Sequence, residues 1–125
     1  MQKLKFESSW DKTLSDKDRK RINQVFLGSN LSKEDSIQLT PLWQARNYKG
    51  ELLVTVLVHN FGTQVLSFRD KNLCYVENNE VVAKHKFPLS NLIIEPKTSM
   101  PWTFIFPVES LCNEPGDKGS VLLSQ

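Results

Sequence analysis

The chain has 125 residues, of which 39% are hydrophobic and 24% are charged, and its formal net charge is +2. A chain of this length forms one domain that buries roughly two thirds of the surface exposed by its unfolded form, so a core needs no disulfide. The near balance of charge excludes the strongly basic composition typical of nucleic-acid binding, and no segment approaches the roughly eighteen apolar residues that span a bilayer.

The N-terminal part is the basic end of the chain. Residues 1–50 hold ten Lys or Arg against six Asp or Glu, whereas residues 51–125 hold six against eight. The first ten residues carry positive charge, but no apolar run follows them, so they do not form a secretory signal. We therefore expect a cytoplasmic protein. In that compartment Cys74 and Cys112 are expected as free thiols, with a single bridge between them as the alternative.

Residues 1–14 are predicted to pack their aromatic side chains on the body of the protein. Phe6, Trp10 and Leu14 are spaced by four, which suits one face of a helix. An extended arm laying the same side chains on the domain fits equally well. The pattern does not decide between the two.

A helix is predicted over residues 15–27. Ser15 can accept a hydrogen bond from the third helical amide, and Asp18 favours the positive end of the helix. The apolar stripe consists of Ile22, Val25 and Phe26. This is the one helix that the sequence predicts with a defined start and a core-facing side.

The candidate partner-binding residues lie on this helix. They are the basic residues Lys17, Arg19, Lys20 and Arg21. Such a cluster can dock on an acidic partner or an anionic lipid surface. It is also what the solvated face of a short helix looks like, since Asp16 and Asp18 offset half of its charge.

The next two segments predict an antiparallel pair of strands. Residues 37–46 alternate apolar and polar positions before Pro41, which cannot donate to a ladder and so places this strand at an edge or at a bend. After a turn at residues 47–50, the segment 51–61 is apolar on both faces and rich in β-branched residues. We predict that this segment lies in the middle of a sheet.

A hairpin is predicted over residues 72–87. Asn78 and Asn79 tolerate the positive φ angles of a tight turn between two strands. In the second strand four alternating residues are expected to share one face, namely Val81, Ala83, His85 and Phe87. The lysines between them point to water.

The last strong strand signal lies between two prolines, where Trp102, Phe104 and Phe106 alternate. Aromatic side chains in such a row are expected in the core. The strands together predict a mainly β fold, an immunoglobulin-like antiparallel β-sandwich with one N-terminal helix. We expect a single domain over residues 1–112 and a flexible tail over residues 113–125.

No catalytic motif is present, so an enzyme is not expected, and no cofactor is implied. A metal site would have to draw His59, His85, Cys74 and a carboxylate such as Asp70 from different strands, and their spacing does not favour it. His59 is expected near solvent at the end of the central strand. His85 is expected to be partly buried. No metal site and no nucleic-acid partner are predicted.

Several segments together resemble the SLAP domain of Gram-positive bacteria. They are Trp10…Leu14-Ser-Asp-Lys-Asp18…Ile22…Phe26, Ile37-x-Leu-Thr-Pro41, Gly50-x-Leu-Leu-Val-Thr-Val-Leu-Val-His-Asn60, Val82-Ala83…Phe87, Ile94-x-Pro96 and Met100-Pro-Trp-Thr-Phe-Ile-Phe-Pro107. The resemblance covers about residues 10–111, and the segment around Trp102 is its most specific part. It supplies no catalytic or binding residues.

The resemblance implies a non-enzymatic protein-binding module that assists export or assembly of surface (S-layer) proteins. Its implied partner is the accessory Sec ATPase or a protein client. A sheet edge, such as the strand containing Pro41, is a second candidate binding surface beside the basic helix. The alternatives are a peripheral membrane adaptor that uses the basic helix, with weak membrane association, and a generic immunoglobulin-like interaction domain. The sequence does not predict the oligomeric state.

Overall fold

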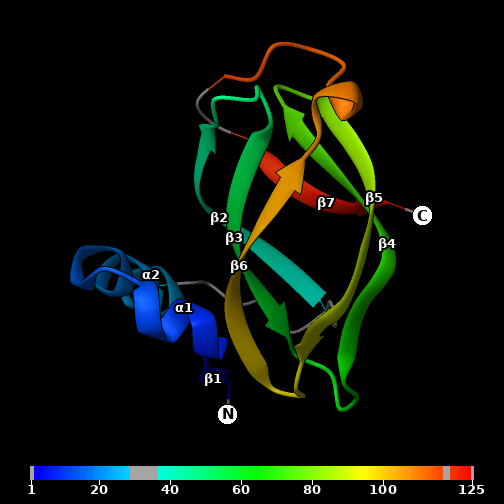
Figure 1. The fold of residues 1–125 in the computed structure, drawn as a ribbon. Helices are drawn as coiled ribbons and strands as arrows, with labels where there is room; N and C mark the ends of the chain where they lie inside the picture. Colours follow the sequence, from blue (N-terminus) through cyan, green and yellow to red (C-terminus); the bar gives the residue numbers. More distant parts are fainter. Residues whose placement is uncertain (1, 29–36, 117–118, 125) are drawn as a thin grey trace.

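A computed structural model describes residues 2–28, 37–116 and 119–124, and it shows a mainly β protein with two helices near its N-terminus (Figure 1). The elements are β1 (Lys3–Leu4), α1 (Ser8–Thr13), α2 (Asp16–Gly28), β2 (Ile37–Arg46), β3 (Leu52–Asn60), β4 (Leu66–Glu77), β5 (Glu80–Ile94), β6 (Thr98–Phe106), the 3₁₀ turn η1 (Val108–Ser110) and β7 (Ser120–Ser124). They form two sheets, with strand orders β1-β6-β3-β2 and β5-β4-β7. The immunoglobulin-like connectivity stays a prediction.

Strand β3 lies between β6 and β2, as predicted for the most apolar segment of the chain. Its alternate residues Leu52, Val54, Val56 and Val58 face the core, and all are at most 2% exposed. Strand β2 pairs with β3 alone within the described residues, so the predicted edge position is confirmed. The register shifts between Pro41 and Trp43, which shows that the edge strand is also bent there.

The core joins the two sheets through aromatic side chains. Phe104 of β6 lies 5.5 Å from Phe68 of β4 and 5.3 Å from Phe87 of β5, measured between ring centroids. Phe87 also contacts Phe106 edge-on at 5.1 Å. The predicted burial of the aromatic row is therefore confirmed for Phe104 and Phe106. Trp102 is only partly buried. It packs against the edge of this core and stacks on Trp10 of α1.

The predicted hairpin is formed by β4 and β5, which are longer than expected. Asn78 and Asn79 make the turn with φ angles of 50° and 66°. Tyr75 pairs with Ala83 and Val76 with Val81, so Val82 is an extra residue in β5 and the expected alternation is wrong there. Val82 and Ala83 are both buried, whereas Val81 is exposed.

The N-terminal segment combines both conformations that its pattern allowed. β1 pairs in parallel with β6, and α1 follows it, capped by the Glu7 carboxylate, which accepts a hydrogen bond from the Ser9 amide at 2.7 Å. The prediction of a single helix is therefore wrong. The helix predicted over residues 15–27 is α2, and Ser15 Oγ accepts from the Asp18 amide at 3.1 Å as expected.

The C-terminal segment is a strand of the second sheet. β7 pairs antiparallel with β4, and Val121 enters the core with 2% of its surface exposed. The flexibility of residues 113–125 stays a prediction, but Val121 belongs to the core, which the sequence pattern did not indicate. This pairing joins distant parts of the chain, since Val121 lies opposite Tyr75. The short apolar segment at the end of the chain therefore carries no sequence pattern from which the pairing could be predicted.

Candidate functional site

The two helices cover the outer face of the sheet that contains β3. Leu57 of β3 and Leu42 of β2 are buried there against Ile22 of α2, which is fully buried. Together these three residues form a second hydrophobic cluster, separate from the main core between the sheets. Partly buried side chains of the N-terminal segment pack against it, among them Phe6, Trp10, Leu14 and Phe26. In Figure 1 the helices lie side by side against this sheet, away from η1. The basic residues of α2 are therefore held in place by a packed helix.

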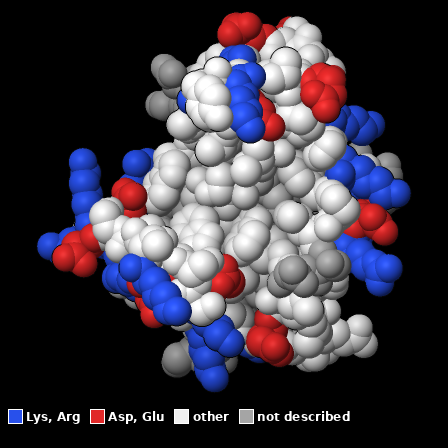
Figure 2. Space-filling model, viewed as in Figure 1, with Lys and Arg blue, Asp and Glu red and all other residues white. Residues whose placement is uncertain are grey.

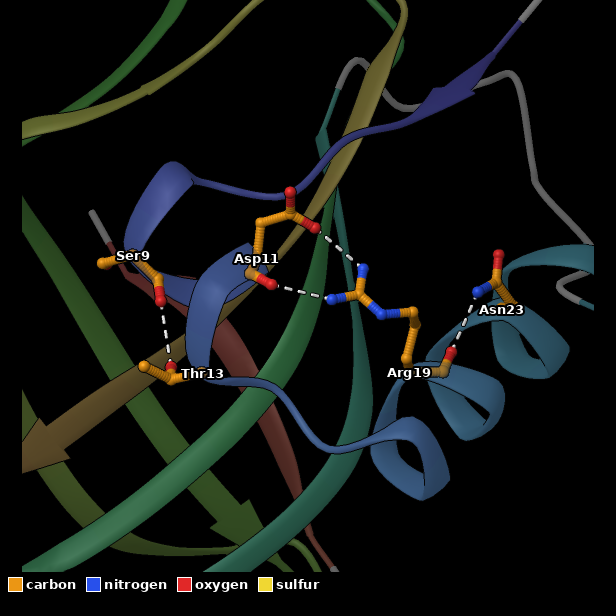
Figure 3. Close-up of polar contacts among 5 residues, drawn as sticks. All are labelled: Ser9, Asp11, Thr13, Arg19 and Asn23. Carbon is orange, nitrogen blue, oxygen red and sulfur yellow. Dashed lines mark hydrogen bonds and ion pairs between the residues drawn. The ribbon is translucent and has the colours of Figure 1, made fainter.

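Arg19 joins the two helices. Figure 3 shows its guanidinium reaching from α2 to Asp11 of α1, where it donates to the carboxylate Oδ1 and to the backbone oxygen, each at 2.9 Å. The same guanidinium lies 5.0 Å from the ring centroid of Phe6. These contacts give Arg19 a structural role between α1 and α2, so its charge is already partnered within the chain.

Arg21 reaches in the other direction, towards the edge strand β2. Its Nη2 donates to the backbone oxygen of Leu42 at 2.8 Å, and its guanidinium lies 5.4 Å from the ring centroid of Trp43. The oxygen of Leu42 is available because the bulge of β2 falls between Pro41 and Trp43. Arg21 therefore ties α2 to the bent part of the edge strand.

Lys17 and Lys20 lie at the mouth of a shallow hollow between α2 and β2, together with Asp18, Arg21 and Trp43. Both lysines are exposed. In Figure 2 lysine and arginine side chains gather over the helices, with acidic side chains among them. Of the four predicted binding residues, the structure brings Lys17, Lys20 and Arg21 together in this hollow, which we call the helix groove. Arg19 is engaged elsewhere.

A second hollow, of about 720 Å³, adjoins the helix groove, and we call it the seam pocket. It lies where the edge strand β2 comes near β7 of the other sheet. Its apolar lining includes Leu52 and Val54 of β3 and Tyr75 of β4, which belong to the main core. Arg21 and Trp43 line both hollows, so the two are neighbours. No local motif predicts this pocket, because its lining comes from five distant segments.

Glu77 holds the C-terminal segment, which forms one wall of the seam pocket. Its Oε1 accepts from the Gly116 amide at 2.7 Å, and its Oε2 accepts from the Tyr75 hydroxyl at 2.9 Å. Gly119 packs directly on this pair, since a Cβ atom there would lie 2.5 Å from Tyr75 Cζ. These contacts fix the distance between the C-terminal segment and β4.

Two polar side chains of β2 complete the seam pocket. Gln44 Nε2 donates to the backbone oxygen of Gly116, but its Oε1 is buried and has no hydrogen-bond partner among the described residues. Arg46 pairs with Glu114 at 3.3 Å, and the Glu114 side chain is 89% exposed. Both side chains therefore connect β2 to the C-terminal segment across the pocket.

The residues considered for a metal site lie in different parts of the fold. His59 of β3 lies on the same face as Leu57 and is fully buried, with its Nδ1 2.6 Å from Ser99 Oγ and its Nε2 3.0 Å from Thr40 Oγ1. The expected position near solvent is wrong, because α1 and α2 cover this face. Burial lowers the pKa of His59 to about 4. His85, partly buried as predicted, packs edge-on against Phe87 in the other sheet.

Within the described parts of the chain, no three His, Cys, Asp or Glu side chains are arranged to hold a metal ion. Cys74 and Cys112 are both free thiols, as expected. None of the helices that the structure describes has the length and apolar character needed to cross a bilayer.

A comparison with protein families matches the SLAP domain over residues 4–121, nearly the whole chain. The chain belongs to the SLAP domain family. This confirms the resemblance found in the sequence and extends it at both ends, so that part of β1, all of α1 and part of β7 fall within the SLAP domain. The family is linked to the accessory Sec system. No curated protein and no solved structure matches the chain.

Proposed function

We propose that this chain is a non-enzymatic protein-binding module that assists export or assembly of surface-layer proteins together with the accessory Sec system. Membership of the SLAP domain family carries this proposal. In it, the chain acts in the cytoplasm on a protein client or on the accessory Sec ATPase. The residues of the chain bind and position a partner and perform no chemistry.

Among the described residues, no strand pairs with the outer side of β2 before its bulge, and this supports the proposal. An extended client segment can add a strand to an exposed sheet edge, with backbone hydrogen bonds giving affinity. Pro41 lies opposite Val56 and has no N–H to donate, so its position suits a backbone site that points away from β3. Leu39, two residues earlier, is expected to point its N–H to the same open side, where a client carbonyl can accept it.

The test is affinity capture from a lysate of a bacterium that carries the accessory Sec system, with the captured proteins identified by mass spectrometry. We expect the accessory Sec ATPase or a surface-layer protein to be enriched. Leu39→Pro, which removes the edge N–H, should abolish the enrichment, whereas Leu39→Ala, which removes only the side chain, should keep most of it. Capture of neither kind of protein by the unmodified chain would overturn the proposed function.

The alternative of a peripheral membrane adaptor has weaker support. A basic side chain near an anionic surface contributes about 1 kcal/mol, and the contacts of Arg19 with Asp11 and Phe6 remove one of the four charges from such a role. The remaining attachment would be weak and sensitive to salt. Co-sedimentation with anionic vesicles at low and high salt measures it directly.

A further inference from the structure

We propose that the outer face of the second sheet, β5-β4-β7, attaches the protein to the surface of an anionic lipid bilayer. Three basic side chains of this face meet the charged lipid headgroups, and two aliphatic side chains beside them enter the headgroup layer. This inference goes beyond the proposed function, because it assigns a surface on the other side of the sandwich from the helices and apart from the edge of β2.

Strand alternation gathers the basic side chains on this outer face. Ala83 and Phe87 of β5 belong to the core, so alternation turns Lys84 and Lys86 outwards, and both are exposed. Arg69 of β4, between a core residue and the bulge of that strand, is also exposed. Figure 2 shows several lysine and arginine side chains on the right-hand side of the molecule, where Figure 1 places β4 and β5.

The charges of this face are not neutralised within the chain. Among the described residues, none of the three cations forms an ion pair. Lys84 lies opposite Cys74 and Lys86 opposite Asn72, so no carboxylate stands across from either lysine. The two lysines are two positions apart on one face, where their like charges repel each other. Anions from outside the chain relieve this repulsion and are attracted to the face.

The basic helix offers less to an anionic surface. Both arginines of α2 donate to acceptors within the chain, and the two aspartates of its first turn lie beside its lysines. On the second sheet the acidic neighbour of the cations is Asp70, which belongs to the bulge of β4 beside Arg69. The positive charge of the second sheet is therefore less compensated than that of α2.

Exposed aliphatic side chains on the same face favour a lipid surface as the anion. Leu122 of β7 lies opposite Cys74 and is 53% exposed, and Val81 of β5 lies opposite Val76 and is 42% exposed. Aliphatic groups beside basic groups suit the boundary between lipid headgroups and acyl chains. A single-stranded nucleic acid stacks on aromatic rings instead, and Tyr48, an aromatic side chain that is largely exposed, lies in the turn between β2 and β3.

Co-sedimentation of the full chain with lipid vesicles tests the proposal. One kind of vesicle contains phosphatidylglycerol and phosphatidylcholine in equal parts, and the other contains phosphatidylcholine alone. We expect the chain to sediment with the first kind at low salt and to be released as the salt concentration rises, because salt screens the attraction. It should stay in solution with the second kind.

Matched lysine variants locate the surface. Lys84→Gln and Lys86→Gln should each weaken the attachment about fivefold, the contribution of one basic side chain at an anionic bilayer. Lys17→Gln and Lys20→Gln remove the same charge from α2 and should change it less than about twofold. All four lysines are exposed, so the variants keep the fold, and thermal unfolding of each one verifies this.

A second matched pair tests the aliphatic contribution. Leu122→Ser should weaken the attachment about fivefold, since part of a leucine side chain no longer enters the headgroup layer. Ile105→Ser is the control, because Ile105 is 48% exposed on a strand of the other sheet, and it should leave the attachment unchanged.

Equal sedimentation with the two kinds of vesicle would overturn the proposal. Release by the α2 variants, with no effect of the β5 variants, would also overturn it, since the helix would then be the membrane surface. A soluble polyglutamate offers the third outcome. If it displaces the chain from the vesicles at a matched concentration of charge, and Leu122→Ser binds the vesicles as well as the unmodified chain does, the face binds acidic polymers in general and the assignment to lipid is wrong.

Discussion

His59 is predicted to make the folded chain sensitive to mild acid. Its imidazole is fully buried and is held between Ser99 and Thr40 by two hydrogen bonds. Burial disfavours the charged ring, so its pKa falls from the usual 6.5 to about 4. In the unfolded chain the ring returns to water and to its usual pKa.

The direction and size of the effect follow from these two values. Between pH 6.5 and 4 the unfolded chain binds the proton and the folded chain does not, so the stability contributed by neutral His59 is complete above pH 6.5 and falls as the solution is acidified. The gap between the two pKa values corresponds to about 3 kcal/mol, of which about 2 kcal/mol is lost between pH 7 and pH 5.

Urea unfolding at several pH values from 7 to 5 measures this loss, and most carboxylates stay ionised over that range. His59→Gln has no titrating ring and should flatten the pH dependence, whatever its effect on stability at pH 7. His85→Gln is the matched control and should keep the slope of the unmodified chain. If His59→Gln and the unmodified chain lose stability in parallel from pH 7 to pH 5, the argument from burial is refuted.

Three further predictions concern the contacts that hold the site together. Gly119→Ala would place a Cβ atom 2.5 Å from Tyr75 Cζ, so we expect a loss of about 1–3 kcal/mol in urea unfolding, whereas Gly28→Ala, with no atom within 4 Å, should show no such loss. Arg19→Gln removes the contacts with Asp11 and Phe6, so it should lower the free energy of unfolding by about 1 kcal/mol and increase amide exchange in α1. Lys12→Gln removes an exposed cation instead and is the control, which should change neither quantity. Ser15→Ala should cost about 1 kcal/mol in thermal unfolding by removing the acceptor for the Asp18 amide, and Ser15→Thr should restore most of it; an unchanged midpoint for Ser15→Ala would contradict the capping role.

Features with a local physical cause were predictable from the sequence. Pro41 has no N–H, and the strand that contains it lies at an edge with a bulge beside it. Asn78 and Asn79 accept positive φ, and they form the turn between β4 and β5. The start of α2 at Ser15 follows from a side chain that satisfies an amide three residues away.

Features that depend on what covers a surface were not predictable in this way. Period-two alternation puts His59 on the opposite face from Val58, but it does not say whether that face meets water or another element. The face is covered because α1 and α2 pack across it, a contact between segments more than thirty residues apart. The extra residue Val82 likewise reverses the alternation of β5 at one point, and only the pairing of β4 with β5 reveals it.

The candidate site depends on these non-local features more than the fold does. The sequence predicted where the charges of the helix groove lie, since Lys17, Lys20 and Arg21 share one helix. It did not predict the hollow beside them. That pocket exists because β7 returns to pair with β4 and because Glu77 holds the C-terminal segment across from β2. A cluster of surface lysines alone would attract any anion. The hollow beside them is built from residues that lie far apart in the chain, so the sequence pattern of the helix does not show what stands next to these charges.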